Sequence, residues 1–261
     1  MTTETAEAIF PYRALPKVPV TACPVCGARH NPARAVLDRY GYPVHVARCA
    51  ECTLQYLAER LTREGYARLY GSGAYRALVE AYCGTPPMTL AESERHYGSW
   101  IGQHLRSPLG QGGSLLDAGG SVGGLIPHLG LAPARVTVLD PCAGELAQVP
   151  AGYQTLQGWL EDPIPGTYDG VVCSQTLDHV TDPIAALRHL RAACPTGWLI
   201  ADFACRPPTA IKIDHPLYWT PVAWERALRA TAWHPREWLP QIALRGTPKR
   251  ATLRHVVTVC R

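Results

Sequence analysis

Four cysteines near the start of the sequence have the spacing of a metal site. Cys23 and Cys26 form one Cys-x-x-Cys pair, Cys49 and Cys52 form a second, and 22 residues separate the pairs. Two such turns brought together supply four thiolates, which is the ligand set of a closed, tetrahedral Zn²⁺ site. A redox-active pair would normally stand alone, at the start of a helix. We therefore predict that these four cysteines bind structural zinc.

A glycine-rich turn lies between two apolar runs in the middle of the chain. The residues of this region with candidate binding roles are Asp117, Gly119, Ser121, Gly123 and Asp140. The apolar runs predict strands, and LIPHLG after the turn predicts a helix, so a ligand can approach the backbone closely and meet the helix N-terminus. An acid that ends the second strand is placed to accept hydrogen bonds from ribose hydroxyls. The spacing differs from the dinucleotide pattern Gly-x-Gly-x-x-Gly.

The elements that must position these residues divide the chain into four predicted segments. These are an N-terminal arm at 1–20, a zinc-binding module at 21–60, a helical lid or linker at 61–109 and a ligand-binding domain at 110–261. In the zinc module, ARAVLDRYGYPVHVARC predicts short strands around a Tyr-Gly-Tyr-Pro turn, as in a zinc ribbon. In the linker, apolar residues at helical spacing predict helices over 61–71 and 88–105, joined by a loop.

Short apolar runs alternate with helical segments after residue 110. The runs SLLDAGG, VTVLDP, GVVCSQ and GWLIADF predict four buried strands of a parallel sheet. TLRHVVTVCR predicts a last strand, with WLPQIALRG as its antiparallel neighbour. Asp182 followed by Pro183 predicts a capped helix start. The predicted fold class is α/β, a doubly wound, Rossmann-like sheet with a small N-terminal zinc-ribbon module and a helical linker.

Composition and charge exclude several classes of protein. The 261 residues are 47% apolar and 18% charged, which excludes a largely disordered chain. No run approaches the ~20 apolar residues of a membrane helix, and no secretory signal precedes the zinc module, so we expect a cytoplasmic protein without membrane contact. The net charge is +4, but residues 225–261 carry eight Lys or Arg against two Glu. This basic end has the charge that attracts phosphates or nucleic acid.

The segment 110–261 resembles the class I S-adenosylmethionine-dependent methyltransferases. LLDAGGSVGGLIPHL is similar to the first motif of that family, with Ser121 in place of the usual middle glycine, and VTVLDP is similar to the second. The resemblance implies S-adenosylmethionine as the cofactor, with Asp140 holding its ribose and Trp159, Leu160 or Glu161 flanking its adenine. The full predicted set of cofactor-binding residues is Asp117, Gly119, Ser121, Gly123, Asp140, Pro141, Leu160, Glu161 and Ser174.

Two histidines are candidates for the chemistry that this resemblance implies. Transfer of an activated methyl group needs an aligned nucleophile and, for a poor nucleophile, removal of a proton. His179 is the best candidate base because its unperturbed pKa of ~6.5 lies near cellular pH, and Asp178 is placed to orient it. His215 follows the predicted strand GWLIADF, in the region where family members carry substrate-contacting loops. Tyr75, with Tyr70, is expected in a lid over the cofactor.

The acceptor is left open between three classes of function. The Cys-x-x-Cys-Gly start and the Tyr-rich linker resemble zinc-containing methyltransferases of natural-product and deoxysugar pathways, which implies a small-molecule acceptor beside Tyr75, Asp178 and His179. Carbon, nitrogen or oxygen acceptors are all compatible, and no oligomeric state is implied. Zinc-finger ribosomal RNA methyltransferases are the second class, favoured by the basic end, although residues 23–60 hold only five Arg and no Lys, so nucleic acid is not the expected partner. The third is a non-catalytic interaction protein on the same fold.

Overall fold

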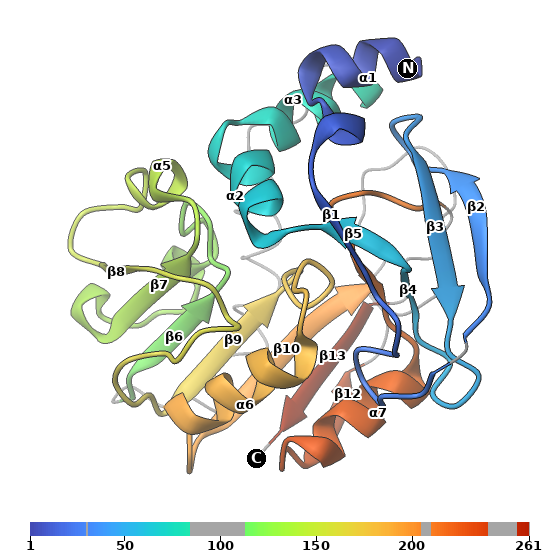
Figure 1. The fold of residues 1–261 in the computed structure, drawn as a ribbon. Helices are drawn as coiled ribbons and strands as arrows, with labels where there is room; N and C mark the ends of the chain where they lie inside the picture. Colours follow the sequence, from blue (N-terminus) through green and yellow to red (C-terminus); the bar gives the residue numbers. More distant parts are fainter. Residues whose placement is uncertain (30, 84–112, 205–209, 240–254, 261) are drawn as a thin grey trace.

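The computed structural model describes residues 1–29, 31–83, 113–204, 210–239 and 255–260. Its centre is a seven-stranded sheet in the order β12-β13-β10-β9-β6-β7-β8 (Figure 1). The five parallel strands are β6 (Leu115–Ala118), β7 (Val136–Asp140), β8 (Gln154–Gln157), β9 (Gly170–Ser174) and β10 (Trp198–Ala204). This arrangement confirms the predicted α/β, Rossmann-like fold.

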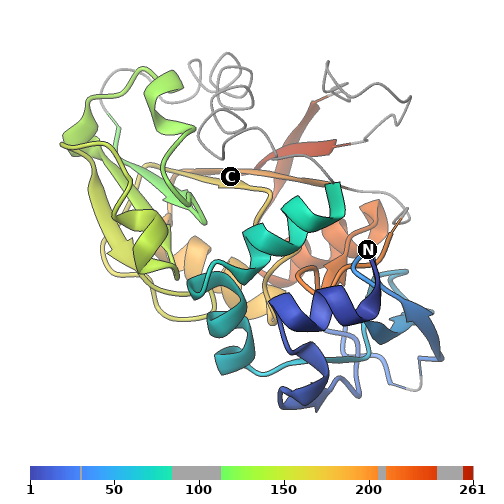
Figure 2. The ribbon, with the colours of Figure 1, turned by 90° about the horizontal axis from the view of Figure 1, so that it is seen from above.

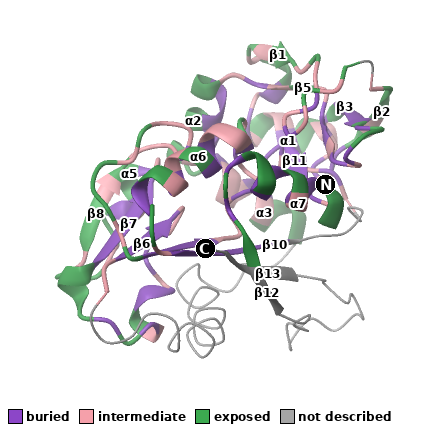
Figure 3. Ribbon diagram, turned by 90° about the horizontal axis from the view of Figure 1, so that it is seen from below, coloured by how far each residue is buried: buried purple, intermediate pink, exposed green. Residues whose placement is uncertain are grey.

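The edges of the sheet differ in part from the prediction. β13 (His255–Cys260) pairs antiparallel with β10 and with β12 (Pro235–Leu239), so β12 begins three residues before the predicted neighbour at 238–246. The rest of that predicted strand, 240–246, lies outside the described residues. β8 was not among the predicted strands because most of its residues are exposed, so it has no continuous apolar run. Figure 3 shows this contrast between the buried central strands and exposed β8.

The segment after the glycine-rich turn corrects a second expectation. In place of the predicted helix, the structure has a single 3₁₀ turn, η3 (Ile126–His128), followed by η4 (Pro133–Arg135). Pro127 has no N–H to donate within a helix, and Gly130 has a left-handed φ of 70° soon after it. The turn therefore offers backbone N–H groups but no long helix whose N-terminus could face a ligand.

Short helices complete the domain. α5 (Ala143–Leu146) follows β7, and α6 (Pro183–Ala193) lies between β9 and β10. The Asp182 side chain accepts a hydrogen bond from the Ala185 backbone N–H at 2.9 Å, which confirms the predicted cap of α6. α7 (Pro221–Ala230) begins in the same way, with the Thr220 side chain accepting from the Ala223 N–H.

The zinc module shares a sheet with the domain. Its strands β2 (Ala33–Leu37), β3 (Pro43–Arg48) and β4 (Gln55–Leu57) are extended by β11 (Leu217–Tyr218), which comes after β10 in the chain. The hairpin of β2 and β3 confirms the predicted strands around the Tyr-Gly-Tyr-Pro turn. One buried cluster contains both the cysteines of the module and apolar side chains of the main sheet. The module is therefore packed onto the domain through a common core.

The N-terminal 20 residues are folded against this module. They form α1 (Thr3–Ile9), the 3₁₀ turn η1 (Tyr12–Ala14) and β1 (Lys17–Pro19), which pairs antiparallel with β5 (Glu59–Leu61). Phe10 and Tyr12 are buried, and the Tyr42 hydroxyl donates to the carbonyls of Ala6 and Phe10.

Two helices of the linker lie beyond the carboxyl ends of the parallel strands (Figure 1), and in Figure 2 they lie between those strands and the zinc module. α2 (Arg63–Gly71) confirms the first predicted helix. The prediction of a loop after α2 is wrong, because α3 (Ala74–Cys83) occupies that segment. This helix buries Ala74 and Leu78 on one face. The second predicted helix, 88–105, lies outside the described residues. None of the helices in the described ranges is long and apolar enough to cross a membrane.

Candidate active site and zinc centre

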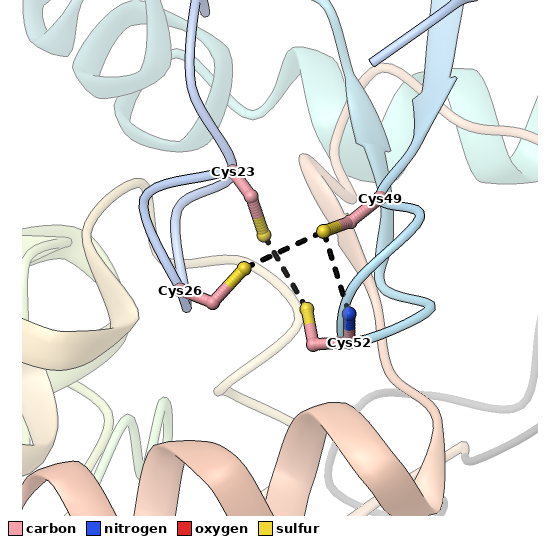
Figure 4. Close-up of side chains that lie close together, drawn as sticks. All are labelled: Cys23, Cys26, Cys49 and Cys52. Atoms are coloured by element: carbon pink, nitrogen blue, oxygen red, sulfur yellow. Dashed lines mark hydrogen bonds between the residues drawn. The ribbon is translucent and has the colours of Figure 1, made fainter. Parts of the chain in front are cut away.

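The four predicted cysteine ligands converge at one point (Figure 4). The Sγ atoms of Cys23 and Cys52 lie 3.5 Å apart, and those of Cys26 and Cys49 lie 3.4 Å apart. All four sulfur atoms are within 4.8 Å of one another. A tetrahedral Zn²⁺ with Zn–S bonds of about 2.3 Å has S–S edges of about 3.8 Å. The donor set and its size therefore fit zinc.

Each cysteine pair is held in a tight turn. The Gly27 N–H donates to the Cys23 carbonyl at 2.9 Å, and the Thr53 N–H donates to the Cys49 carbonyl at 3.1 Å. Both Gly27 and Thr53 have left-handed φ values, of 73° and 63°. The Thr53 hydroxyl also lies 2.7 Å from the hydroxyl of Thr220, which caps α7. The second turn is thus fixed to the start of α7 in the α/β domain as well as to its own module.

The glycine-rich turn is shaped by the strand ends around it. The Gly119 N–H donates to the Leu139 carbonyl at 2.7 Å, and Gly119, Ser121 and Gly123 all have left-handed φ values between 51° and 76°. A Cβ on Gly119 would lie 2.3 Å from the Thr176 side chain. Glycine is therefore required at this position both by backbone conformation and by contact with Thr176.

Asp140 ends β7 and faces this turn. Its carboxylate accepts hydrogen bonds from the Ser121 N–H at 3.1 Å and the Cys142 N–H at 2.8 Å. Burial raises the pKa of Asp140 to about 6, and the neighbouring Glu145 acts in the same direction. Each carboxylate oxygen has a second acceptor position, so Asp140 can still accept from ribose hydroxyls. The donor set fits the nucleoside part of the predicted cofactor.

Sequence reasoning missed two residues beside this turn. The Ser121 hydroxyl donates to Glu145 Oε2 at 2.5 Å, and Glu145 Oε1 lies 3.4 Å from the Arg76 guanidinium. Arg76 belongs to α3 and also lies over the Tyr75 ring, 4.9 Å from its centroid. The lid helix is therefore connected to the turn through an ion pair, and no spacing in the sequence indicates this connection.

The other predicted cofactor residues lie around the same sheet edge. Asp117 is buried in β6, Pro141 follows Asp140, and Ser174 ends β9, where its hydroxyl donates to Asp202 at 3.3 Å. Leu160 is 5% exposed and packs in the main core. Glu161 accepts from both the backbone N–H and the hydroxyl of Thr181, so its carboxylate holds the loop after β9.

Trp159, of the predicted adenine-flanking group, is half-buried like Glu161, whereas Leu160 is buried. The Arg63 guanidinium lies 5.2 Å from the Trp159 ring centroid and is paired with Asp162. Arg63 is the first residue of α2, so this contact also connects the linker helices to the edge of the sheet.

The structure brings the four predicted catalytic residues together beyond β9. The rings of His179 and His215 have centroids 4.3 Å apart, and the Tyr75 ring lies 6.2 Å from that of His179. Asp178 Oδ2 accepts from His215 Nδ1 at 2.8 Å. Its other oxygen is 4.0 Å from His179 Nε2, which is too long for a hydrogen bond. The expectation that Asp178 orients His179 is thus corrected, because its hydrogen-bonded partner is His215.

Three further residues complete this cluster. The Tyr70 hydroxyl lies 2.9 Å from His179 Nδ1 and donates to the Asp214 backbone carbonyl at 3.1 Å. His215 Nε2 lies 2.8 Å from Lys212 Nζ and 3.2 Å from Asp214 Oδ2. Tyr70 was predicted only as a lid residue, whereas Lys212 and Asp214 were not singled out. Their proximity to His215 in the sequence is the one signal that could have found them.

The charges of the cluster favour a neutral His179. Burial lowers the pKa of His179 to about 4, and the charge of His215 acts in the same direction. Burial opposes ionisation of Asp178, but the charges of His215 and His179 outweigh it and hold the pKa of that carboxyl below its usual range. At neutral pH the cluster therefore contains an ionised Asp178 beside an imidazole that is free to take a proton.

The same cluster contains the donor atoms of a possible second metal site. Ligand atoms of Asp178, His179 and His215 lie within 4.8 Å of one another. Both ring nitrogens of His215 already contact protein groups, Asp178 on one side and Lys212 on the other. A metal ion would have to displace these contacts, so hydrogen bonding and proton transfer describe the cluster better than metal ligation.

Comparisons with known proteins agree with this geometry. Residues 93–241 match the family model described as a methyltransferase domain. Burkholderia thailandensis 1,6-didemethyltoxoflavin-N1-methyltransferase, solved with S-adenosylhomocysteine, has a TM-score of 0.55 at 20% identity, over 84% of this chain and 95% of its own. A Leishmania major S-adenosylmethionine-dependent methyltransferase has a TM-score of 0.53 at 19% identity, over 75% of this chain and 82% of its own.

A third solved structure comes from a biosynthetic pathway. CalO1, a methyltransferase in calicheamicin biosynthesis, has a TM-score of 0.51 at 16% identity, over 75% of this chain and 60% of its own. No curated protein matches the chain in sequence. The structural likeness shows a shared class I methyltransferase fold, and the family model covers more than half of the residues. The chain belongs to the methyltransferase domain family.

Proposed function

We propose that this protein transfers a methyl group from S-adenosylmethionine to a small-molecule acceptor, with His179 as the general base. One observation carries the proposal: Thr176 connects the glycine-rich turn to the backbone of His179 in the histidine cluster. Gly119 packs on the Thr176 side chain, and the Thr176 carbonyl accepts a hydrogen bond from the backbone N–H of His179 at 2.9 Å. A cofactor held by the turn and Asp140 would therefore lie beside the candidate base.

The residues divide the task between them. When bound, S-adenosylmethionine supplies a methyl group on a positively charged sulfur, which is a good leaving group. The turn and Asp140 hold the nucleoside, while Tyr70 of α2 and Tyr75 of α3 exclude water from the acceptor. His179 takes a proton from the acceptor as the nucleophile reaches the methyl carbon. Orientation by these side chains supplies most of the remaining rate enhancement.

Two of the similar structures support a small-molecule acceptor. One is a methyltransferase solved with 1,6-didemethyltoxoflavin, and another acts in calicheamicin biosynthesis. A small natural-product or sugar-type intermediate is the acceptor class that we propose. A cytoplasmic location goes with this proposal, since both substrates of such a reaction are cytoplasmic metabolites.

Structural Zn²⁺ is the second part of the proposal. The thiolates of the four-cysteine cluster would hold the module together, because a metal bound only by the folded state stabilises that state. Purified protein should contain one zinc per chain, and Cys52→Ser should lose the metal and lower the melting temperature. Zinc-free protein of full thermal stability would contradict this role.

The methyl-transfer proposal is tested with labelled cofactor. Protein is incubated with radiolabelled S-adenosylmethionine and an extract of the host, and the products are separated by size and nuclease sensitivity. Label in the small-molecule fraction supports the proposal. Label in nuclease-sensitive material would replace it with RNA methylation, for which the basic segment 225–261 would be the binding surface. Absence of any label together with absence of cofactor binding in calorimetry would indicate a non-catalytic protein.

A further inference from the structure

The hydrogen bonds around Tyr70 determine which nitrogen of His179 carries the proton. The Tyr70 hydroxyl has one proton and lies near two partners, the Asp214 carbonyl at 3.1 Å and His179 Nδ1 at 2.9 Å. A carbonyl oxygen can only accept. Both contacts are satisfied together only if Tyr70 donates to Asp214 and accepts from an Nδ1–H of His179. Neutral His179 then has an unprotonated Nε2.

That Nε2 faces a second atom without a proton. Asp178 Oδ1 lies 4.0 Å from His179 Nε2, is buried, and accepts no hydrogen bond from the described part of the chain. The other oxygen, Oδ2, accepts from His215 Nδ1. His215 Nδ1 carries the proton of this contact because a carboxylate oxygen can only accept. Its Nε2 lies 2.8 Å from Lys212 Nζ and 3.2 Å from Asp214 Oδ2. His179 Nε2 and Asp178 Oδ1 are therefore two acceptor atoms that face each other, and neither carries a proton.

We propose that Tyr70 is the positioning residue that fixes His179 as the Nδ1–H tautomer, so that Nε2 accepts the acceptor's proton and Asp178 Oδ1 stabilises the imidazolium. This inference rests on the proposed function and narrows it. The acceptor is a neutral group that carries a proton, such as a hydroxyl, an N–H or an acidic C–H. An anionic carboxylate or thiolate would instead be repelled by the ionised Asp178.

Protons and electrons balance in the proposed methyl transfer. Nε2 takes the proton of the acceptor's X–H bond, and the electron pair of that bond forms the new bond to the methyl carbon. The carbon–sulfur pair stays on sulfur, so the sulfonium charge disappears while His179 becomes cationic. The positive charge thus moves from the sulfur to the edge of Asp178, where an unpaired carboxylate oxygen is already in place.

Tyr66 provides a matched control. It lies one turn before Tyr70 on α2, the two rings are stacked at 6.3 Å, and its hydroxyl donates to the Ile213 carbonyl at 3.3 Å. Tyr66→Phe and Tyr70→Phe therefore each remove one buried hydroxyl and leave one neighbouring carbonyl unpaired. Of these two tyrosines, only Tyr70 contacts His179.

The test is nitrogen NMR of protein labelled with ¹⁵N-histidine, with His179 assigned from the missing signals of His179→Gln. The expected wild-type spectrum has a protonated Nδ1 and an unprotonated Nε2, also without cofactor or acceptor. Tyr70→Phe should mix the two tautomers, and Tyr66→Phe should leave the wild-type pattern. A protonated Nε2 in the wild type, or an unchanged tautomer in Tyr70→Phe, overturns the proposal.

Kinetics with the labelled cofactor give a second readout. Tyr70→Phe should lower kcat about 10- to 100-fold, within the range of a misplaced general base, while Tyr66→Phe changes it less than about 2-fold. Equal losses in both variants would show a merely structural role. If wild-type protein transfers no methyl group, the proposed function fails, whereas the NMR result still decides the tautomer.

Discussion

Two buried aspartates at the same edge of the sheet have pKa values that are shifted in opposite directions. Within the part of the chain that the structure describes, Asp140 accepts hydrogen bonds only from backbone N–H groups, and burial raises its pKa to about 6. Asp178 is at least as buried, yet His215 and His179 hold its pKa below the usual range. Burial alone therefore does not decide whether the pKa of a buried carboxyl is raised or lowered. The difference is made by cationic or proton-donating side chains within a few ångströms.

The two aspartates are therefore suited to two different functions at one edge of the sheet. A carboxyl near its pKa and surrounded by backbone donors is suited to holding neutral hydroxyl groups. A firmly ionised carboxylate beside a neutral imidazole is suited to stabilising a proton that arrives on the imidazole. The following substitutions test whether the two aspartates serve these different sites.

The largest effect is expected for His179→Gln. Glutamine keeps a polar side chain but cannot take the acceptor's proton, so kcat should fall about 10²- to 10⁴-fold, while the Kd for S-adenosylmethionine changes less than about 2-fold. Labelled methyl transfer and calorimetry measure the two quantities. His45→Gln, in an exposed position of β3, is the control and should change neither. Full activity of His179→Gln would reduce His179 to a packing residue.

Gly119→Ala tests the contact that joins the two regions. The new Cβ would meet the Thr176 side chain at 2.3 Å, and alanine is disfavoured at φ 76°. We expect a loss of about 2–3 kcal/mol in the free energy of unfolding, measured by denaturant titration. Gly71→Ala, where a Cβ meets no atom within 4 Å, should be close to neutral. Similar stability of the two variants would show that the turn relaxes freely.

Paired amide substitutions test the comparison directly. Asp140→Asn should weaken S-adenosylmethionine binding about 10- to 100-fold, since a charged hydrogen-bond acceptor contributes about 1.5–3 kcal/mol. Asp178→Asn should leave that Kd within about 2-fold and lower kcat instead. Calorimetry and labelled transfer on both variants give the answer. Equal weakening of cofactor binding by the two substitutions would contradict the division of roles.

The smallest effect concerns pH. The raised pKa means that Asp140 is protonated as the pH falls through about 6, which removes an acceptor for ribose hydroxyls. Cofactor affinity should therefore be highest above pH 6 and fall by up to about 10-fold between pH 7 and pH 5. Glu145 and Arg76 also face this site, so Asp140→Asn is the necessary control and should flatten the profile. An unchanged slope in Asp140→Asn would show that Asp140 does not control the pH dependence of cofactor binding.

Much of the fold could be predicted from local pattern. The central strands β6, β7, β9 and β10 are buried on both faces, so each is a continuous apolar run in the sequence. The exposed edge strand β8 lacks such a run and could not be recognised. α3 was missed because Gly71, Ser72 and Gly73 indicate a loop just before it. Its helical state is stabilised by burying Ala74 and Leu78 against other elements.

The candidate site also contains residues that could be recognised from the sequence and residues that could not. The cysteine pairs, the glycine-rich turn and Asp140 are each recognisable from residues close together in the sequence. The partners of His179 are not, because Tyr70 is 109 residues away and reaches it only when α2 lies over the strand ends. Lys212 and Asp214 reach the cluster because β11, which follows them, pairs with β4 of the zinc module.

The sequence by itself determined which residues carry chemistry: four thiolates, a glycine-rich turn with its acid, and two histidines beyond strand ends. It did so because ligand spacing and strand termini are properties of short stretches of chain. Only the tertiary structure decided the protonation and hydrogen-bond partners of those residues. Asp178 contacts His215 and not the adjacent His179, and Tyr70 contacts His179 Nδ1. Such states depend on burial and on charges brought together from distant segments, which no local pattern contains.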